Sequence, residues 1–108
     1  MKLNIKKVKI GSSYYDIKYI YDLRDIKNAR FLGFFNAAKK LIEIDDNCLQ
    51  TELQALLHEC VHGIFWDKAI KIDDEEKVIE PLASGLYALI IDNPKFIQKI
   101  LDYTKKIK

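Results

Sequence analysis

The chain has 108 residues, with 18 basic and 16 acidic side chains and a formal net charge of +2. This length predicts one domain, residues 1–108, with a modest core and an open cleft for any active site. The near balance of charge argues against direct nucleic-acid binding, and no segment has the apolar length of a signal peptide or membrane span, so a cytoplasmic protein without membrane contact is expected.

Two β-hairpins are predicted in the first half of the chain. Val8 to Ile10 and Tyr14 to Tyr21 are rich in β-branched and aromatic residues and flank a Gly-Ser-Ser turn. Phe31 to Phe35 and Lys40 to Ile44 have the same character around a short polar turn. We therefore expect a small antiparallel sheet made of two hairpins.

A long amphipathic helix should follow the second hairpin. Asp45-Asp46-Asn47 supplies candidate N-cap residues, and the helix is expected to end near Trp66. Its apolar residues recur three and four positions apart: Leu49, Leu53, Leu56, Leu57, Cys60, Val61, Ile64 and Phe65.

The centre of this predicted helix carries both histidines of the chain, His58 and His62, in an H-E-x-x-H pattern with Glu59. Positions i and i+4 of a helix lie on one face, so the two imidazoles can bind one Zn²⁺. Glu59 is placed to act as the general base of a metal-assisted hydrolysis. The alternative is a buried helix with two core histidines. Cys60 is expected to be a small apolar filler, not a ligand.

A second helix is predicted after a polar connection over residues 67–74. Asp73 and Glu76 have capping-box spacing, so the helix should start at Asp73 or Asp74 and end near Asn93-Pro94. Pro81 either kinks this helix or lies in the first turn of one that starts later. The expected core stripe consists of Val78, Ile79, Leu82, Ala83, Leu86, Leu89 and Ile90. Residues 96–103 predict a short final helix.

A catalytic zinc site normally has three protein ligands, so the second helix should supply one. Glu75, Glu76 and Glu80 are the candidates. If the two helices run antiparallel, Glu76 fits best as the third ligand, and Glu80 is the alternative.

These features together resemble the small ImmA/IrrE-type zinc metallopeptidases, in particular their short phage and prophage forms. The resemblance covers roughly Lys7 to Pro94. It rests on a hairpin sheet, on the run LLHECVHGI (residues 56–64) and on the acidic helix EEKVIEPLASGLY (residues 75–87). It implies an α+β fold and a gluzincin-like site, in which the two histidines and a glutamate of the following helix bind Zn²⁺. Some relatives cleave a repressor protein.

The expected function is therefore zinc-dependent hydrolysis of peptide bonds in a protein substrate, such as a repressor or another regulator of a phage or mobile element. A peptide is expected to pair with an exposed sheet edge such as Leu41 to Ile44. Two alternatives remain open. One is a non-catalytic zinc-binding or protein-interaction domain of a phage or prophage, and the other is a self-inhibited peptidase whose tail, Phe96 to Lys108, covers the cleft.

Overall fold

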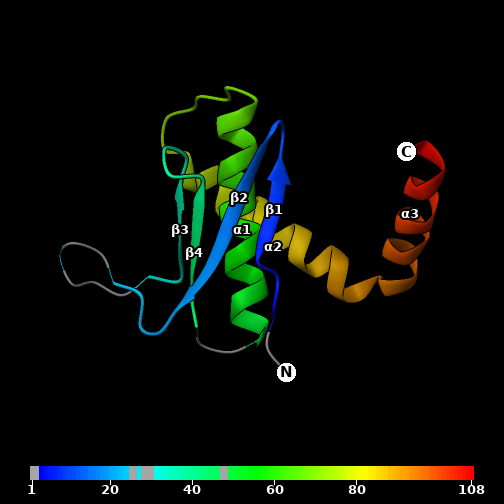
Figure 1. Ribbon diagram of the computed structural model, residues 1–108, viewed down its shortest axis with the longest axis horizontal. Helices are drawn as coiled ribbons and strands as arrows, with labels where there is room; N and C mark the ends of the chain where they lie inside the picture. The colour runs from blue at the N-terminus through cyan, green and yellow to red at the C-terminus, as the bar shows by residue number, and fades with distance from the viewer. Residues whose placement is uncertain (1–2, 25–26, 28–30, 47–48) are drawn as a thin grey trace.

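The structure is a computed structural model that describes residues 3–24, 27, 31–46 and 49–108, with only the backbone at 49 and 50. It is an α+β fold in which a four-stranded sheet lies against helix α1, while α2 and α3 extend to one side (Figure 1). The elements in chain order are β1 (Lys7–Ile10), β2 (Ser13–Ile20), β3 (Gly33–Asn36), β4 (Leu41–Asp45), α1 (Leu49–Asp67), α2 (Glu76–Asp92) and α3 (Pro94–Ile107).

The sheet has the strand order β1-β2-β4-β3 and is mixed. Both predicted hairpins are present as antiparallel pairs, β1 with β2 and β3 with β4. The hairpins join through β2 and β4, which run parallel with Ile17 opposite Ile42 and Tyr19 opposite Ile44. The expectation of a wholly antiparallel sheet is therefore wrong at this junction.

The position of β4 follows from its side chains. Ile42 and Ile44 are fully buried, whereas β3 contains Gly33 and the exposed Phe34. Burial of the two isoleucines favours an interior place for β4, which leaves β3 at the edge. Leu41 to Ile44 is therefore not the exposed edge that the sequence suggested, and the edge on this side of the sheet is β3.

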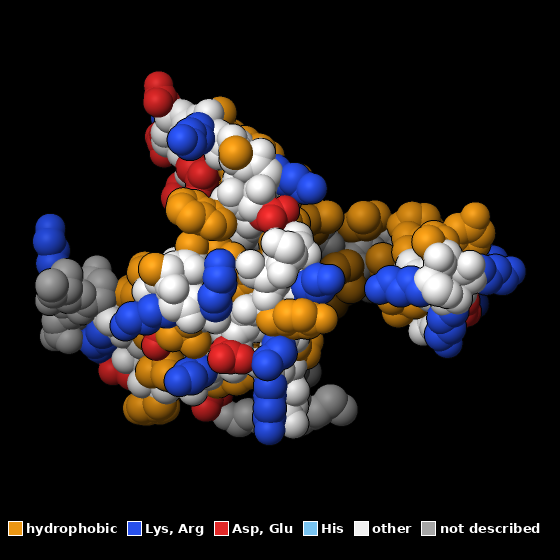
Figure 2. Space-filling view, turned by 45° about the horizontal axis from the view of Figure 1, so that its top comes forward, with side chains coloured by type: hydrophobic (Ala, Val, Ile, Leu, Met, Phe, Trp, Pro, Cys, Tyr) orange, Lys and Arg blue, Asp and Glu red, His pale blue; other side chains and the backbone are white. Residues whose placement is uncertain are grey.

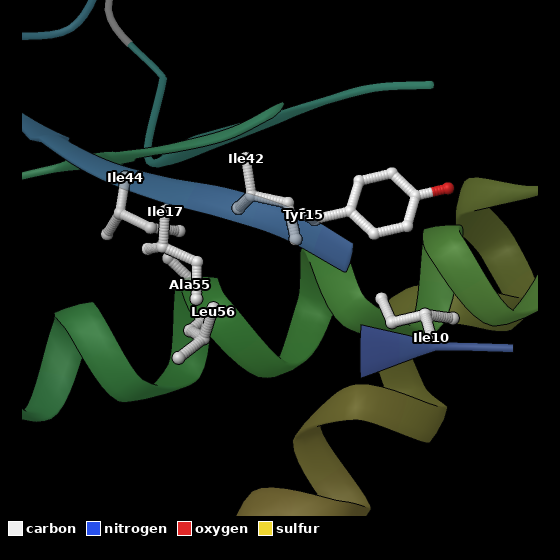
Figure 3. Close-up of a cluster of buried hydrophobic side chains, with 7 residues drawn as sticks. All are labelled: Ile10, Tyr15, Ile17, Ile42, Ile44, Ala55 and Leu56. Carbon is white, nitrogen blue, oxygen red and sulfur yellow. The ribbon is translucent and has the colours of Figure 1, made fainter. Parts of the chain in front are cut away.

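Helix α1 covers one face of the sheet. The inward residues of β2 and β4 alternate along each strand and meet Ala55 and Leu56 of the helix (Figure 3). The buried cluster consists of Ile10, Tyr15, Ile17, Ile42, Ile44, Ala55 and Leu56. Cys60 is half-buried against this cluster, as expected of an apolar filler, and burial raises the pKa of its thiol to about 11.

Gly63 lets α1 approach the sheet closely beside His62. A Cβ atom at this position would lie 2.7 Å from Cδ1 of Ile10 and 3.1 Å from Cε1 of Phe35. The first distance is too short for a carbon contact, so a side chain here would require Ile10 and the ring of Phe35 to shift.

The predicted helix caps differ from the structure. Asp45 belongs to β4, and its buried carboxylate accepts a hydrogen bond from the N–H of Leu23 at 2.9 Å. Asn47, the other end of the predicted cap, lies outside the described residues. Helix α2 starts at Glu76, and Glu75 flanks it without a side-chain cap, so the predicted start at Asp73 or Asp74 is wrong. Those two residues form a turn in which Asp74 has φ +53°.

Helix α2 packs on α1 through a second buried cluster, which consists of Val61, Phe65, Ile79 and Ala83. Pro81 lies inside α2 beyond its first turn, so the alternative that placed Pro81 in the first turn of a helix is wrong. The predicted core stripe is only partly buried, because Val78, Leu82 and Leu89 are exposed. None of the described helices is both long and apolar enough to cross a membrane.

Helix α3 projects away from the sheet and α1 (Figure 1). Among the helices and strands it contacts only α2. In Figure 2 this projecting arm shows hydrophobic side chains along its upper side and basic side chains below. The tail therefore does not cover the cleft between α1 and the start of α2, contrary to the expectation for a self-inhibited enzyme.

The C-terminal end of α1 closes in a Schellman motif. The N–H of Ile70 donates to the carbonyl of Phe65 at 2.9 Å, and the N–H of Ala69 donates to the carbonyl of Trp66 at 3.2 Å. Ala69 has φ +54°, at the position where glycine is normally found. The motif fixes the direction in which the chain leaves α1 toward α2.

Replacing Ala69 by glycine should stabilise the protein. The left-handed conformation costs an L-residue about 1–2 kcal/mol, and the added backbone freedom of glycine offsets roughly 0.5–1 kcal/mol of this. We expect Ala69→Gly to raise the free energy of unfolding by about 0.5–1 kcal/mol in urea titrations. The control, Ala88→Gly at an exposed position inside α2, should lower it by a similar amount. A loss of stability at both positions would contradict the assignment.

Removal of residues 94–108 should leave the body of the protein, which consists of the sheet, α1 and α2, folded, because α3 contacts only α2. We expect the free energy of unfolding, followed by the fluorescence of Trp66, to change by less than about 0.5 kcal/mol. Trp66 is the single tryptophan and lies at the end of α1, so its signal reports on the body alone. A loss of several kcal/mol would show that α3 packs against the body.

Candidate metal centre

His58 and His62 lie one turn apart on the side of α1 that faces α2. Their ring centroids are 5.0 Å apart, and both side chains are half-buried. The i, i+4 spacing of the helix places them on one face, as the sequence predicts. Their buried neighbours Val61 and Phe65 pack against α2, so the histidines stand beside the helix–helix contact.

The first residue of α2, Glu76, meets both imidazoles through the same type of ring nitrogen. Nε2 of His58 lies 3.1 Å from Oε2 of Glu76, and Nε2 of His62 contacts Oε1 of the same carboxylate. The donor atoms of the three residues all lie within 4.8 Å of one another. In the part of the chain that the structure describes, these three residues are the group of His, Cys, Asp or Glu side chains that can hold a metal ion.

The other ring nitrogen of each histidine faces a second glutamate. Nδ1 of His62 lies 2.7 Å from Oε2 of Glu75, and Nδ1 of His58 lies 3.2 Å from Oε2 of Glu80. Glu80, the alternative third ligand in the sequence analysis, therefore lies on the side of His58 that points away from the shared carboxylate. The three glutamates differ in position, with Glu76 between the two Nε2 atoms and the others at Nδ1.

This division matches a common feature of metal sites in proteins. An imidazole that binds a metal through one nitrogen usually donates its other N–H to a carboxylate, which fixes the ring orientation and raises the basicity of the ligand. Glu75 is placed for this role because it forms a hydrogen bond with Nδ1 of His62. Glu80 is close enough to Nδ1 of His58, at 3.2 Å, to form an ion pair with that ring when it is protonated. The start of α2 also favours acidic side chains, since the helix N-terminus carries partial positive charge.

Glu59 lies between α1 and the edge strand β3. Its side chain is only 6% exposed, and a Cβ on Gly33 would come within 3.0 Å of its Oε2 atom. The absence of a side chain at Gly33 thus leaves room for the carboxylate. Burial raises the pKa of Glu59 to about 7, with His58 acting to lower it and Glu76 to raise it. The carboxylate of Glu59 thus interacts electrostatically with two residues of the metal-binding group.

The donor set fits zinc better than the hard cations. Two imidazole nitrogens and one carboxylate are typical of a catalytic zinc site with an open position, whereas Mg²⁺ and Ca²⁺ prefer oxygen ligands alone. A cation bound at the metal centre would lower the pKa of Glu59 and so oppose the effect of burial, because a nearby cation favours the ionised carboxylate.

Comparison with known proteins gives no further guide to this site. No protein-family model, curated protein or solved structure matches the chain. The functional proposal therefore depends on the geometry of the residues themselves.

Neutralising the three glutamates one at a time should separate their roles. We expect Glu76→Gln to reduce zinc affinity by more than the roughly 10–100-fold loss typical of outer partners. Glu75→Gln and Glu80→Gln should reduce it by about tenfold or less, since the amide oxygen still accepts a hydrogen bond. Competition with a chromophoric chelator measures each affinity.

Asp92→Asn, at the far end of α2, serves as the matched control and should leave zinc affinity unchanged. If Glu80→Gln were as damaging as Glu76→Gln, Glu80 would be a direct ligand.

Proposed function

We propose that this protein is a zinc-dependent metallopeptidase of the ImmA/IrrE type that hydrolyses peptide bonds of a protein substrate. The observation that carries the proposal is the meeting of both Nε2 atoms at one carboxylate, Glu76, with the buried Glu59 beside them. A structural zinc site is normally closed by four protein ligands. In the described residues three converge here, which suits a site that keeps one position open for reaction.

His58, His62 and Glu76 would hold the metal. Zn²⁺ bound at this position would polarise a carbonyl group and make a neighbouring water molecule more acidic. Glu75, the residue before α2, would orient the His62 ring through its hydrogen bond to Nδ1, and Glu80 of α2 lies near Nδ1 of His58.

Glu59 would act as the general base. Its carboxylate accepts a proton from the water that attacks the scissile carbonyl carbon, and it then transfers that proton to the nitrogen of the leaving amine as the C–N bond breaks. Its place between α1 and Gly33 supports this role, because a peptide bound beside β3 would pass directly next to it.

The free edge of β3 is suited to bind the substrate backbone. The N–H of Asp45 donates to the carbonyl of Leu32 at 2.8 Å, so the backbone groups of Leu32 point toward β4. Because these groups alternate along a strand, those of Gly33 and Phe35 point to the open side. In the described part of the chain β3 pairs only with β4. An extended peptide can therefore add to this edge, alongside Glu59 and the histidines.

The substrate is proposed to be a protein with a flexible segment, such as a repressor or another regulator of a phage or mobile element. Pairing with β3 requires an extended backbone, which an unfolded or surface-exposed segment provides. The alternative is a non-catalytic zinc-binding domain, and it would bind zinc without cleaving any protein.

Glu59→Gln should retain one zinc ion per chain and lose proteolysis. The amide preserves the size of the side chain but cannot accept the proton, so we expect cleavage of denatured casein to fall by at least about 10²-fold. Metal analysis and gel-based cleavage assays measure the two properties. Glu43→Gln, on the neighbouring strand β4, is the control and should retain activity.

Cleavage by Glu59→Gln at the wild-type rate would falsify the assigned base. Stoichiometric zinc without cleavage of any denatured protein by the wild-type chain would favour the non-catalytic alternative.

A further inference from the structure

An apolar cavity of about 530 Å³ opens directly beside His62. Its walls come from three parts of the chain that meet at the end of α1. Phe35 belongs to β3, Phe65 and Trp66 to α1, and Ile70 and Ile72 to the connection between α1 and α2. The volume lies within the range of roughly 300–1,000 Å³ that is usual for ligand-binding pockets.

The cavity has a fixed base and an exposed rim. Phe65 is buried in the cluster between α1 and α2, and the Schellman motif fixes the backbone of Ile70 relative to it. Trp66, Ile70 and Ile72 are 64%, 40% and 43% exposed, so their apolar surfaces meet water in the free protein. Covering such surface with an apolar group is favourable.

The hollow on the other side of the histidines is different. It measures about 130 Å³ and is lined by residues that include Leu32, Gln54, His58, Glu80 and Ser84. Leu32, just before β3, lines the small hollow, and Phe35 of β3 lines the cavity. The two residues are three positions apart along the chain. A peptide paired with β3 would therefore pass one small hollow of mixed polarity and one large, apolar cavity, with a histidine at each.

We infer that the cavity beside His62 is the specificity pocket of the peptidase and binds a large apolar or aromatic side chain next to the bond that is cut. This inference rests on the proposed function. The cavity shares His62 and Glu75 with the candidate metal centre, and it shares Phe35 with the strand edge proposed to bind the backbone. Lys71 and Glu75 add one charge of each sign, so the preference is set by the aromatic and aliphatic walls.

The inference can be tested by binding, without turnover. Hydroxamates bind a zinc ion directly, and a series with benzyl, isobutyl, methyl or carboxymethyl side chains varies only the group offered to the cavity. We expect the benzyl and isobutyl compounds to bind the zinc-loaded protein about 10- to 50-fold more tightly than the methyl compound. They should also shift the emission of Trp66, the single tryptophan of the chain and part of the cavity wall.

Two variants connect this preference to the cavity. Ile70→Ser and Ile72→Ser change half-exposed side chains in the connection, so the fold should be retained. Both should reduce the benzyl-to-methyl ratio of affinities to below about threefold with zinc affinity unchanged. Ile91→Ser, at an exposed isoleucine at the far end of α2, is the control and should keep the ratio of the wild-type chain.

The outcomes separate the two proposals. Zinc binding with equal affinity for all four hydroxamates would overturn the specificity pocket and leave the metallopeptidase proposal standing. Failure to bind zinc would overturn the metallopeptidase proposal and, with it, the role of the cavity. If N-acetylphenylalanine amide shifted Trp66 emission in the metal-free chain as strongly as the benzyl hydroxamate does with zinc, the cavity would be a general apolar site and the inference would be wrong.

Discussion

Helix α1 is packed on two sides at once, and the arrangement of the molecule depends on this. One side, with Ala55 and Leu56, covers the sheet, and the other, with Val61 and Phe65, packs against α2. Gly63 leaves room for the side chains of Ile10 and Phe35 against the helix. The histidines lie where these two packed sides adjoin, so their positions are set by the burial of apolar surface around them.

Local patterns in the sequence predicted the elements well because each has a strong period. The alternation in β2 and β4 and the three-and-four spacing in α1 correspond to buried faces in the structure. The parallel pairing of β2 with β4 was not predicted in this way, since a period of two indicates the buried face of a strand and does not indicate which strands pair. Asp45 is not a helix cap because its carboxylate binds the N–H of Leu23, and the predicted cap Asp73 lies in a turn outside α2.

In the candidate site, too, local spacing was predictable and tertiary contacts were not. The spacing of His58 and His62 fixed their common face, but the roles of three nearby glutamates depend on how α2 meets α1. Glu75 lies at His62 and Glu80 at His58. In Figure 1 helix α2 crosses α1 and does not run back along it, so the predicted antiparallel arrangement of the two helices is wrong. The cavity was missed because the connection after α1 was interpreted as polar. The signal was present in Trp66, Ile70 and Ile72, which are large apolar residues in a segment that also contains charges.

The division of the site between two helices has a consequence for its integrity. Both histidines belong to α1, which is attached to the sheet, whereas Glu75, Glu76 and Glu80 all come from α2 and the residue before it. A small rotation of α2 would therefore withdraw these three carboxylates together and leave the imidazoles in place. Ile79, fully buried in the cluster between the helices, opposes such a rotation. The alignment of the site is thus maintained by an aliphatic side chain that is not itself one of the metal-binding residues.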